Sequence, residues 1–261
     1  MSNSNSNNVI LLKNPSVPQD PYDAKFATSH YAPHFIPLLT HTHTNKHLTT
    51  TYLSSAEFLD HCDVFIITSQ RAVEMFHECL CGIPAATRAR IYAKVGYTVG
   101  PATYSILKGC GFVDVRGGER AGNGSKLADL ISGEIGKEAR VVFFTGEIRK
   151  DIIPRKLCGL GYHLKEVVIY KTECREDIVE RFERLMMGLD LGWIVFFSPQ
   201  GTKEIVDHLR RQNGGRKWKI ASIGPTTEEY LLEYDIKPNV IAEKPEPESL
   251  FQCIYKYDTT K

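Results

Sequence analysis

The sequence contains one junction twice, as TVGPATYSIL at 98–107 and as SIGPTTEEYL at 222–231. In both copies a short strand-like run meets Gly-Pro, and a helical pattern begins there. Proline is preset for the first turn of a helix, where its missing N–H is not needed. Each copy therefore predicts a strand end followed at once by a helix start, and the repeat predicts two related structural units.

Other segments repeat around this junction. DVFIITSQRAVEMF at 63–76 resembles WIVFFSPQGTKEIV at 193–206, and VILLK at 9–13 resembles VVFFT at 141–145. These short apolar runs alternate with helical patterns, which is typical of parallel sheets with helices on both faces. We therefore predict an α/β fold of two similar domains, with parallel sheets flanked by helices and a cleft between the domains.

Two polar segments mark where the chain crosses between the domains. THTHTNKHLTTTY at 40–52 has no periodicity, which favours a linker or a long loop, and KTECRED at 171–177 is the second candidate. Two crossings make one domain discontinuous. We predict one domain from residues 1–42 and 173–261, an inserted domain at 52–165, and linkers at 43–51 and 166–172.

The composition excludes several classes of protein. The 261 residues carry a net charge of +1, so no overall field attracts nucleic acid or an anionic membrane. No apolar run is long enough to span a membrane, and the start MSNSNSNN lacks the parts of a signal peptide. The seven cysteines are an odd number without zinc spacing, which favours a reduced, cytoplasmic protein with buried thiols.

Polar residues and glycines follow the predicted strands. In an open α/β sheet, ligands bind beyond the carboxyl ends of the strands, and helix N-termini there attract anions. The alternative is that these residues only cap helices, and Thr226 with Glu229 fits a capping box. Both interpretations stay open. The residues concerned are Ser69, Thr103, Gly146, Ser198, Gly224, Thr226 and Thr227.

Other candidates have weaker support. His41, His43 and His47 are spaced as metal ligands, but no carboxylate or cysteine accompanies them, which favours a solvated loop. Arg149 and Lys150 follow a strand end and are either near an anion or on a solvated helix face. No phosphate-binding loop is present, and no Ser/His/Asp or Cys/His set has supporting spacing.

Several segments resemble the uroporphyrinogen-III synthase family in their order and spacing. They are IITSQRAVE (66–74), VGPAT (99–103), FTGEIRKDIIP (144–154), GYHLKEVVIYKT (161–172), FFSPQGT (196–202) and KIASIGPTT (219–227). The resemblance implies two α/β domains joined by a pair of strands, with both termini in one domain. It also implies closure of hydroxymethylbilane, a linear tetrapyrrole, with inversion of ring D and loss of water. Neither a cofactor nor a metal is implied, and we expect a monomer.

The resemblance also assigns roles to residues. A tyrosine at the position of Tyr170 is the favoured donor to the departing hydroxyl, although a core tyrosine is the plain alternative. Substrate contacts are implied for Ser69, Thr103, Ser198, Lys219 and Thr227. The alternative function is a non-catalytic two-domain protein that binds a polycarboxylate or another polyanionic small molecule. A nucleotide-dependent transferase is disfavoured, because no ribose-binding acid follows the first strand.

Overall fold

The computed structural model describes residues 7–16, 19–211 and 218–260. Contacts divide the chain into two compact units, which we call unit 1 (Met1–Thr40 and Cys174–Lys261) and unit 2 (His41–Glu173). The chain thus leaves unit 1 once and returns to it once, two residues before and one residue after the boundaries of 42 and 173 predicted for the discontinuous domain. Each of the four hydrophobic clusters found among the described residues draws its residues from one unit.

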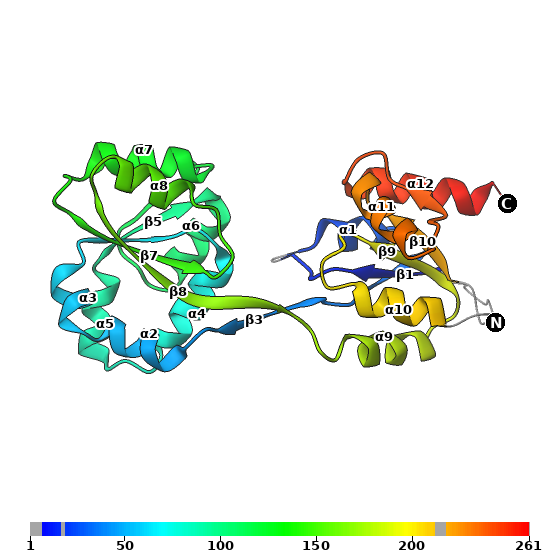
Figure 1. The fold of residues 1–261 in the computed structure, drawn as a ribbon, viewed down its shortest axis with the longest axis horizontal. Coiled ribbons are helices and arrows are strands. Elements are labelled where there is room, and N and C mark those ends of the chain that lie inside the picture. The colour runs from blue at the N-terminus through cyan, green and yellow to red at the C-terminus, as the bar shows by residue number, and fades with distance from the viewer. Residues whose placement is uncertain (1–6, 17–18, 212–217, 261) are drawn as a thin grey trace. The chain divides into compact units, whose positions relative to one another are not determined.

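Unit 1 is a five-stranded parallel sheet in the order β11-β10-β9-β1-β2 with helices on its faces (Figure 1). Its strands are β1 (Asn7–Leu12), β2 (Tyr31–Phe35), β9 (Gly192–Phe196), β10 (Lys219–Ser222) and β11 (Val240–Ile241). Its helices are α1 (Pro21–Ala27), α9 (Ile178–Met187), α10 (Lys203–Arg211), α11 (Pro225–Glu233) and α12 (Pro247–Thr259).

Unit 2 has a six-stranded sheet in the order β3-β8-β7-β4-β5-β6. Its strands are β3 (Leu39–His43), β4 (Val64–Ile67), β5 (Val95–Val99), β6 (Val115–Gly118), β7 (Arg140–Gly146) and β8 (His163–Cys174). Its helices are α2 (Lys46–Leu53), α3 (Ala56–His61), α4 (Gln70–Leu80), α5 (Ala85–Tyr92), α6 (Gly100–Gly109), α7 (Gly124–Glu134) and α8 (Ile152–Gly159).

The sequence repeats correspond to one sheet built twice. Matched by these repeats, the order β2-β1-β9-β10-β11 of unit 1 equals the order β8-β7-β4-β5-β6 of unit 2. The chain starts this sheet at a different strand in each unit, and β3 is an added strand beside β8. In each unit, successive strands are added toward one edge of the sheet and then toward the other. The direction changes between β1 and β9 in unit 1 and between β4 and β7 in unit 2. Doubly wound sheets bind ligands at such a point.

Strand alternation places apolar side chains on both faces of each sheet. In unit 1, Ile10 and Leu12 pack in one buried cluster, while Val9 and Leu11 pack in another. Side chains of this size each contribute about 1.5–3 kcal/mol when fully buried. The continuous apolar runs of the sequence are therefore central strands, covered by helices on both faces.

The predicted loop at 40–52 is wrong, because this segment ends β3 and forms most of α2. The side chain of Asn45 caps α2 by accepting from the amide of Leu48 at 3.0 Å. Thr49 and Thr50 donate back to the carbonyls of Asn45 and Lys46 at 3.0 and 2.9 Å, so their hydroxyls are satisfied within the helix. The segment 166–172 lies within β8, and its assignment as a linker stays a prediction.

The seven cysteines are all free in the structure. Cys62 and Cys79 are buried, but Cys81, Cys158 and Cys174 are exposed, so the prediction of buried thiols holds for only part of the set. Within the described ranges, no helix is both long and apolar enough to cross a membrane.

Candidate active site

A cavity of about 350 Å³ opens at the carboxyl ends of the strands of unit 2. It lies where the direction of strand addition changes, since its lining includes Thr68 and Ser69 after β4 and Thr145 and Gly146 at the end of β7. Tyr170, on β8, lines the same cavity. Three of the predicted site residues, Ser69, Gly146 and Tyr170, are thus brought together.

The ring of Tyr170 is fixed in this cavity by its neighbours. Its hydroxyl lies 3.1 Å from the hydroxyl of Ser69. A Cβ atom on Gly146 would lie 2.5 Å from Cζ of Tyr170, so only glycine lets the ring occupy this place. The amide of Glu147 donates to the carbonyl of Tyr170 at 2.9 Å. The phenol is therefore a positioned hydrogen-bond donor or acceptor at the edge of the sheet.

Ser69 has two roles at once. It is the N-cap of α4, accepting from the amide of Ala72 at 3.1 Å, and it also contacts Tyr170. The capping interpretation therefore holds for this residue, and the ligand-site interpretation stays a prediction. A hydroxyl that caps a helix is held in a fixed direction, which suits the orientation of a neighbouring phenol.

The two Gly-Pro junctions begin α6 and α11 without a side-chain cap. Gly224 itself is the N-cap of α11, so the predicted capping box of Thr226 and Glu229 is wrong. The first amides of such a helix keep their hydrogen-bonding capacity for a ligand or for water. Thr226 is exposed at this end, whereas Thr103 and Thr227 are buried, with 5% and 4% exposure.

Ser198 follows β9 at the carboxyl edge of unit 1, close in sequence to the end of a buried strand. Of the predicted contacts in this unit, Ser198, Gly224, Thr226 and Thr227 thus follow strand ends at one edge of one sheet. Lys219 does not, because it begins β10 and lies at the opposite, amino edge. Within unit 1, the structure does not bring Lys219 to the other predicted residues.

Lys219 instead belongs to a cluster that attaches α12 to the sheet. Its ammonium pairs with Asp258 and lies 5.2 Å from the ring centre of Trp193. Asp258 also accepts from Trp193 Nε1 and from the Tyr31 hydroxyl, each at 2.9 Å. Burial alone raises the pKa of Asp258, but these three donors outweigh it and the pKa is lowered.

A basic residue that the site predictions missed lies at the carboxyl end of β1. Lys13 pairs with Asp20, the N-cap of α1, whose side chain is 2% exposed. Its ammonium lies 5.0, 5.8 and 5.5 Å from the ring centres of Tyr22, Phe35 and Phe197. A lysine directly after an apolar strand, followed by an Asp-Pro helix start, was the available signal.

Two basic residues, Arg149 and Lys150, line the cavity of unit 2 and differ in their ion pairing. Arg149 is paired with Glu166. Lys150 lines the cavity, is exposed, and has no hydrogen bond or ion pair to any residue that the structure describes. Lys150 is therefore a cation available to an anionic ligand beside Tyr170.

The histidines of 41–47 do not form a metal centre. Among the described residues, no group of three histidine, cysteine or acidic side chains is arranged to hold a metal ion. His41 bonds the Thr172 hydroxyl at 2.9 Å, and His43 bonds Glu78 at 2.8 Å. Both rings are therefore engaged with side chains of unit 2.

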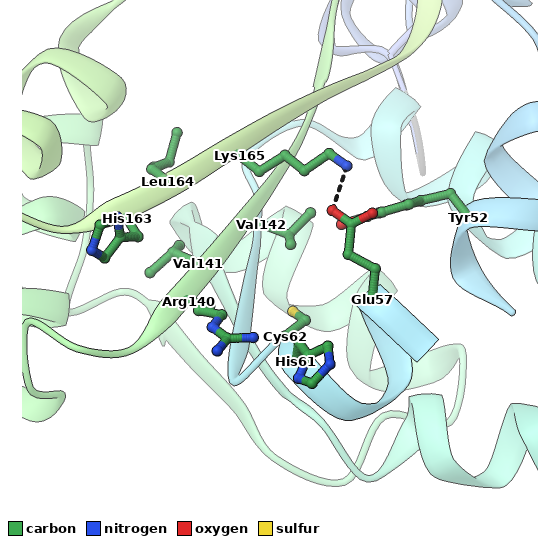
Figure 2. Close-up of a pocket in the computed structure, with 10 residues that line it drawn as sticks. All are labelled: Tyr52, Glu57, His61, Cys62, Arg140, Val141, Val142, His163, Leu164 and Lys165. Atoms are coloured by element: carbon green, nitrogen blue, oxygen red, sulfur yellow. Dashed lines mark hydrogen bonds and ion pairs between the residues drawn. The ribbon is translucent and has the colours of Figure 1, made fainter. Parts of the chain in front are cut away.

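A second cavity of unit 2, of about 330 Å³, lies at the opposite edge of the same sheet. Figure 2 shows its lining, which includes Arg140 and His163 at the starts of β7 and β8. Lys165 and Glu57 pair across one side of it at 2.6 Å. None of the predicted site residues lines this cavity, and it lies away from the carboxyl ends where doubly wound sheets bind ligands.

Comparison with known proteins gives consistent matches. The family model described as Uroporphyrinogen-III synthase HemD matches residues 20–252. The chain is 40% identical to the uroporphyrinogen-III synthase of Saccharomyces cerevisiae, with 100% of each chain covered. It is 32% identical to that of Schizosaccharomyces pombe, covering 95% of this chain and 96% of the relative. The fold resembles that of uroporphyrinogen-III synthetase from Helicobacter pylori, with a TM-score of 0.57 at 17% identity, covering 94% and 97% of the two chains.

The repeated sheet and its edge residues define a doubly wound α/β protein of two units, with a site suited to an anionic small molecule. Within that class, the chain belongs to the uroporphyrinogen-III synthase family, whose members are enzymes of porphyrin biosynthesis. The predicted family and the predicted α/β fold class are therefore confirmed.

Proposed function

We propose that this chain closes hydroxymethylbilane to uroporphyrinogen III, with inversion of ring D and loss of water. The membership of the family supports this activity. The observation that carries the site is the Tyr170 hydroxyl, held 3.1 Å from that of Ser69 in a cavity beside an unpaired lysine. Tyr170 is the proposed catalytic residue.

In the proposed mechanism, Tyr170 donates a hydrogen bond to the hydroxymethyl oxygen of the substrate. This oxygen departs as water and leaves an azafulvene. The substituted carbon of ring D attacks the azafulvene carbon and forms a spiro intermediate, which opens and closes again with ring D inverted. A proton lost from ring carbon balances the proton taken by the leaving hydroxyl. A donor of this kind typically contributes about 10²–10⁴-fold to the rate.

The remaining task of the protein is to hold a flexible chain in one geometry, since uncatalysed closure gives the other isomer. Fixing reacting groups in a near-attack geometry contributes on the order of 7–11 kcal/mol in favourable cases. The substrate carries eight carboxylates, which suit helix N-termini, hydroxyls and an unpaired cation. Besides Ser69 and Lys150, the proposed contacts are Thr103, Gly146, Ser198, Gly224, Thr226 and Thr227.

The test uses freshly prepared hydroxymethylbilane and separates the product isomers after oxidation to porphyrins. We expect the protein to shift the product from isomer I to isomer III, with buffer alone as the control. If the folded protein binds the substrate and isomer I still forms, the chain is a binding protein and not a synthase. Heat-denatured protein provides the second control, because it keeps the composition and loses the site.

We propose the cytoplasm as the compartment and a monomer as the working state. The seven free cysteines support a reducing compartment. Size-exclusion chromatography with light scattering tests the second part, and a mass of twice 29.4 kDa would contradict it.

A further inference from the structure

His41 is the first residue of unit 2 and lies on β3, the strand beside β8 in the sheet (Figure 1). Its ring meets the ring of Tyr170 nearly at a right angle, with centres 6.1 Å apart and planes at 75°. This is the edge-to-face geometry that aromatic pairs prefer. The imidazole therefore packs against the same ring that Gly146 and Ser69 position.

The imidazole is itself oriented by a hydrogen bond. Its Nδ1 lies 2.9 Å from the hydroxyl of Thr172, two residues beyond Tyr170 on β8. Residues two apart on a strand point to the same face. His41 thus contacts two neighbouring side chains on one face of β8, which fixes both the position and the rotation of its ring.

The surroundings of His41 favour the uncharged ring. Burial, the largest cause, lowers its pKa, and the nearby Arg71 lowers it further, whereas Glu74 opposes them. Arg71 and Glu74 lie on α4, the helix that Ser69 caps, and they pair with each other at 2.8 Å. A neutral ring adds no charge next to the phenol, so its influence on Tyr170 is one of position.

We propose that His41 is a positioning residue, whose ring, held by Thr172, keeps the Tyr170 hydroxyl directed toward Ser69. This inference rests on the proposed function for its catalytic consequence. Its structural part, the dependence of the Tyr170 ring on His41, stands independently. Nothing in the sequence motif indicated this role, because the H-x-H spacing suggested a metal or a solvated loop.

The first measurement reads the Tyr170 ring without any turnover. In protein carrying ring-labelled tyrosine, the Tyr170 resonance is assigned by its loss in Tyr170→Phe. We expect His41→Ala to shift and broaden that resonance. His43→Ala is the matched control, because His43 lies two residues along β3 and bonds Glu78 instead. An unchanged Tyr170 resonance in His41→Ala would overturn the inference, whatever the activity of the protein.

The second measurement reads the catalytic consequence. We expect His41→Ala to lower kcat about tenfold with KM nearly unchanged, since a small displacement of a catalytic group is costly. His41→Phe keeps the ring contact and should recover most of this loss, and Thr172→Val should lower kcat in the parent but not in His41→Phe. In the Tyr170→Phe background, His41→Ala should have no further effect. An equal loss in both backgrounds contradicts action through Tyr170.

The two measurements separate the two proposals. If the unmodified protein forms no isomer III while the Tyr170 resonance still depends on His41, the proposed function fails and the structural inference holds. If the unmodified protein is active and neither the resonance nor kcat responds to His41→Ala, the inference fails and the proposed function holds.

Discussion

The carboxyl edges of the two units have the same origin in sequence and different contents. In unit 2, Thr145 and Gly146 end the strand and leave room for the ring of Tyr170 above a cavity. In unit 1, the matching positions are Lys13 and Asn14. Lys13 is enclosed by a buried carboxylate and three aromatic rings, and Asn14 accepts from the amides of Leu38 and Leu39.

From this difference we infer that the carboxyl edges of the two units have different roles. The edge of unit 2 keeps an accessible phenol, a hydroxyl and an unpaired cation, which are groups for chemistry. At the edge of unit 1, Lys13 after the central strand β1 forms an ion pair with Asp20, the N-cap of α1, and so stabilises the start of that helix. We therefore expect substitutions at matching positions to affect catalysis in unit 2 and stability in unit 1.

The largest expected effect concerns stability, through Asp20→Asn. Asparagine keeps the N-cap but removes the charge, so the Lys13 ammonium stays among aromatic rings without a counter-charge. Breaking a buried ion pair in this way costs about 3 kcal/mol of unfolding free energy. Denaturant titration measures this loss. Glu248→Gln is the control, because its pair with Lys25 is exposed and contributes little.

Acid should remove the same contribution. Burial alone raises the pKa of Asp20, but Lys13 and the amides of Ser16 and Tyr22 outweigh it and lower the pKa below its ordinary value. In the unfolded chain the pKa of an Asp carboxyl is about 3.9, and above that pH the pair contributes its full stabilisation. The contribution is lost as the pH falls from there through the pKa of Asp20 in the folded protein. The stability difference between parent and Asp20→Asn should shrink in that range. A difference that persists at lower pH would contradict the assignment to this charge.

The next effect is catalytic and belongs to unit 2. Tyr170→Phe should lower kcat on the order of 100-fold with KM little changed, because the donor is lost while the ring remains. Tyr162→Phe is the matched control, since its hydroxyl donates to the carbonyl of Ile135 at 2.9 Å and lies outside the cavity. A rate equal to that of the parent removes Tyr170 from the mechanism.

Gly146→Ala tests whether catalysis requires the position that the Tyr170 ring occupies against Gly146. The added methyl would lie 2.5 Å from Cζ of Tyr170, so the ring has to move. We expect kcat to fall about tenfold, as for a displaced catalytic group. At Gly122 a Cβ would meet nothing within 4 Å, so Gly122→Ala should leave kcat unchanged. Normal turnover in Gly146→Ala would show that the ring position is not required.

The fold was largely predictable, because the strands are continuous apolar runs and the Gly-Pro junctions mark where strands end and helices begin. The segment 40–52 was not predictable as structure. Thr49 and Thr50 satisfy their hydroxyls inside α2. Burial of Thr49 and Leu53 also fixes this helix, and helix propensity alone does not reveal such packing. The linkers at 43–51 and 166–172 stay predictions, and the structure shows that the first lies mostly in α2 and the second within β8.

The site was predictable only where it follows strand ends. Ser69, Gly146 and Tyr170 were found by that rule or by resemblance, and the structure brings them together. His41 was missed as a neighbour of Tyr170, because contact across two strands depends on their register. Lys219 was implied as a substrate contact by the resemblance alone, and that role stays a prediction. The structure adds that Lys219 begins β10, at the amino edge of its sheet.

Lys219→Gln tests that predicted role. The substitution leaves Asp258 with two of its three donors, and the lysine is 39% exposed. We expect a loss of about 1 kcal/mol in unfolding free energy, near the upper end for a partly exposed pair. KM for hydroxymethylbilane should not change. A raised KM with unchanged stability would restore Lys219 to the binding residues.

The smallest effect comes from the most direct comparison, Ser69→Ala against Ser198→Ala. The two serines follow corresponding strands, each two residues after the end of β4 or of β9. Ser69 caps α4 and contacts Tyr170, so its loss should lower both stability and kcat. Ser198 is a proposed substrate contact of unit 1, and we expect Ser198→Ala to raise KM by less than about threefold, which is less than the contribution of one ordinary hydrogen bond. If Ser198→Ala lowers kcat as strongly as Ser69→Ala does, the two edges share the chemistry and the inference that they have different roles is wrong.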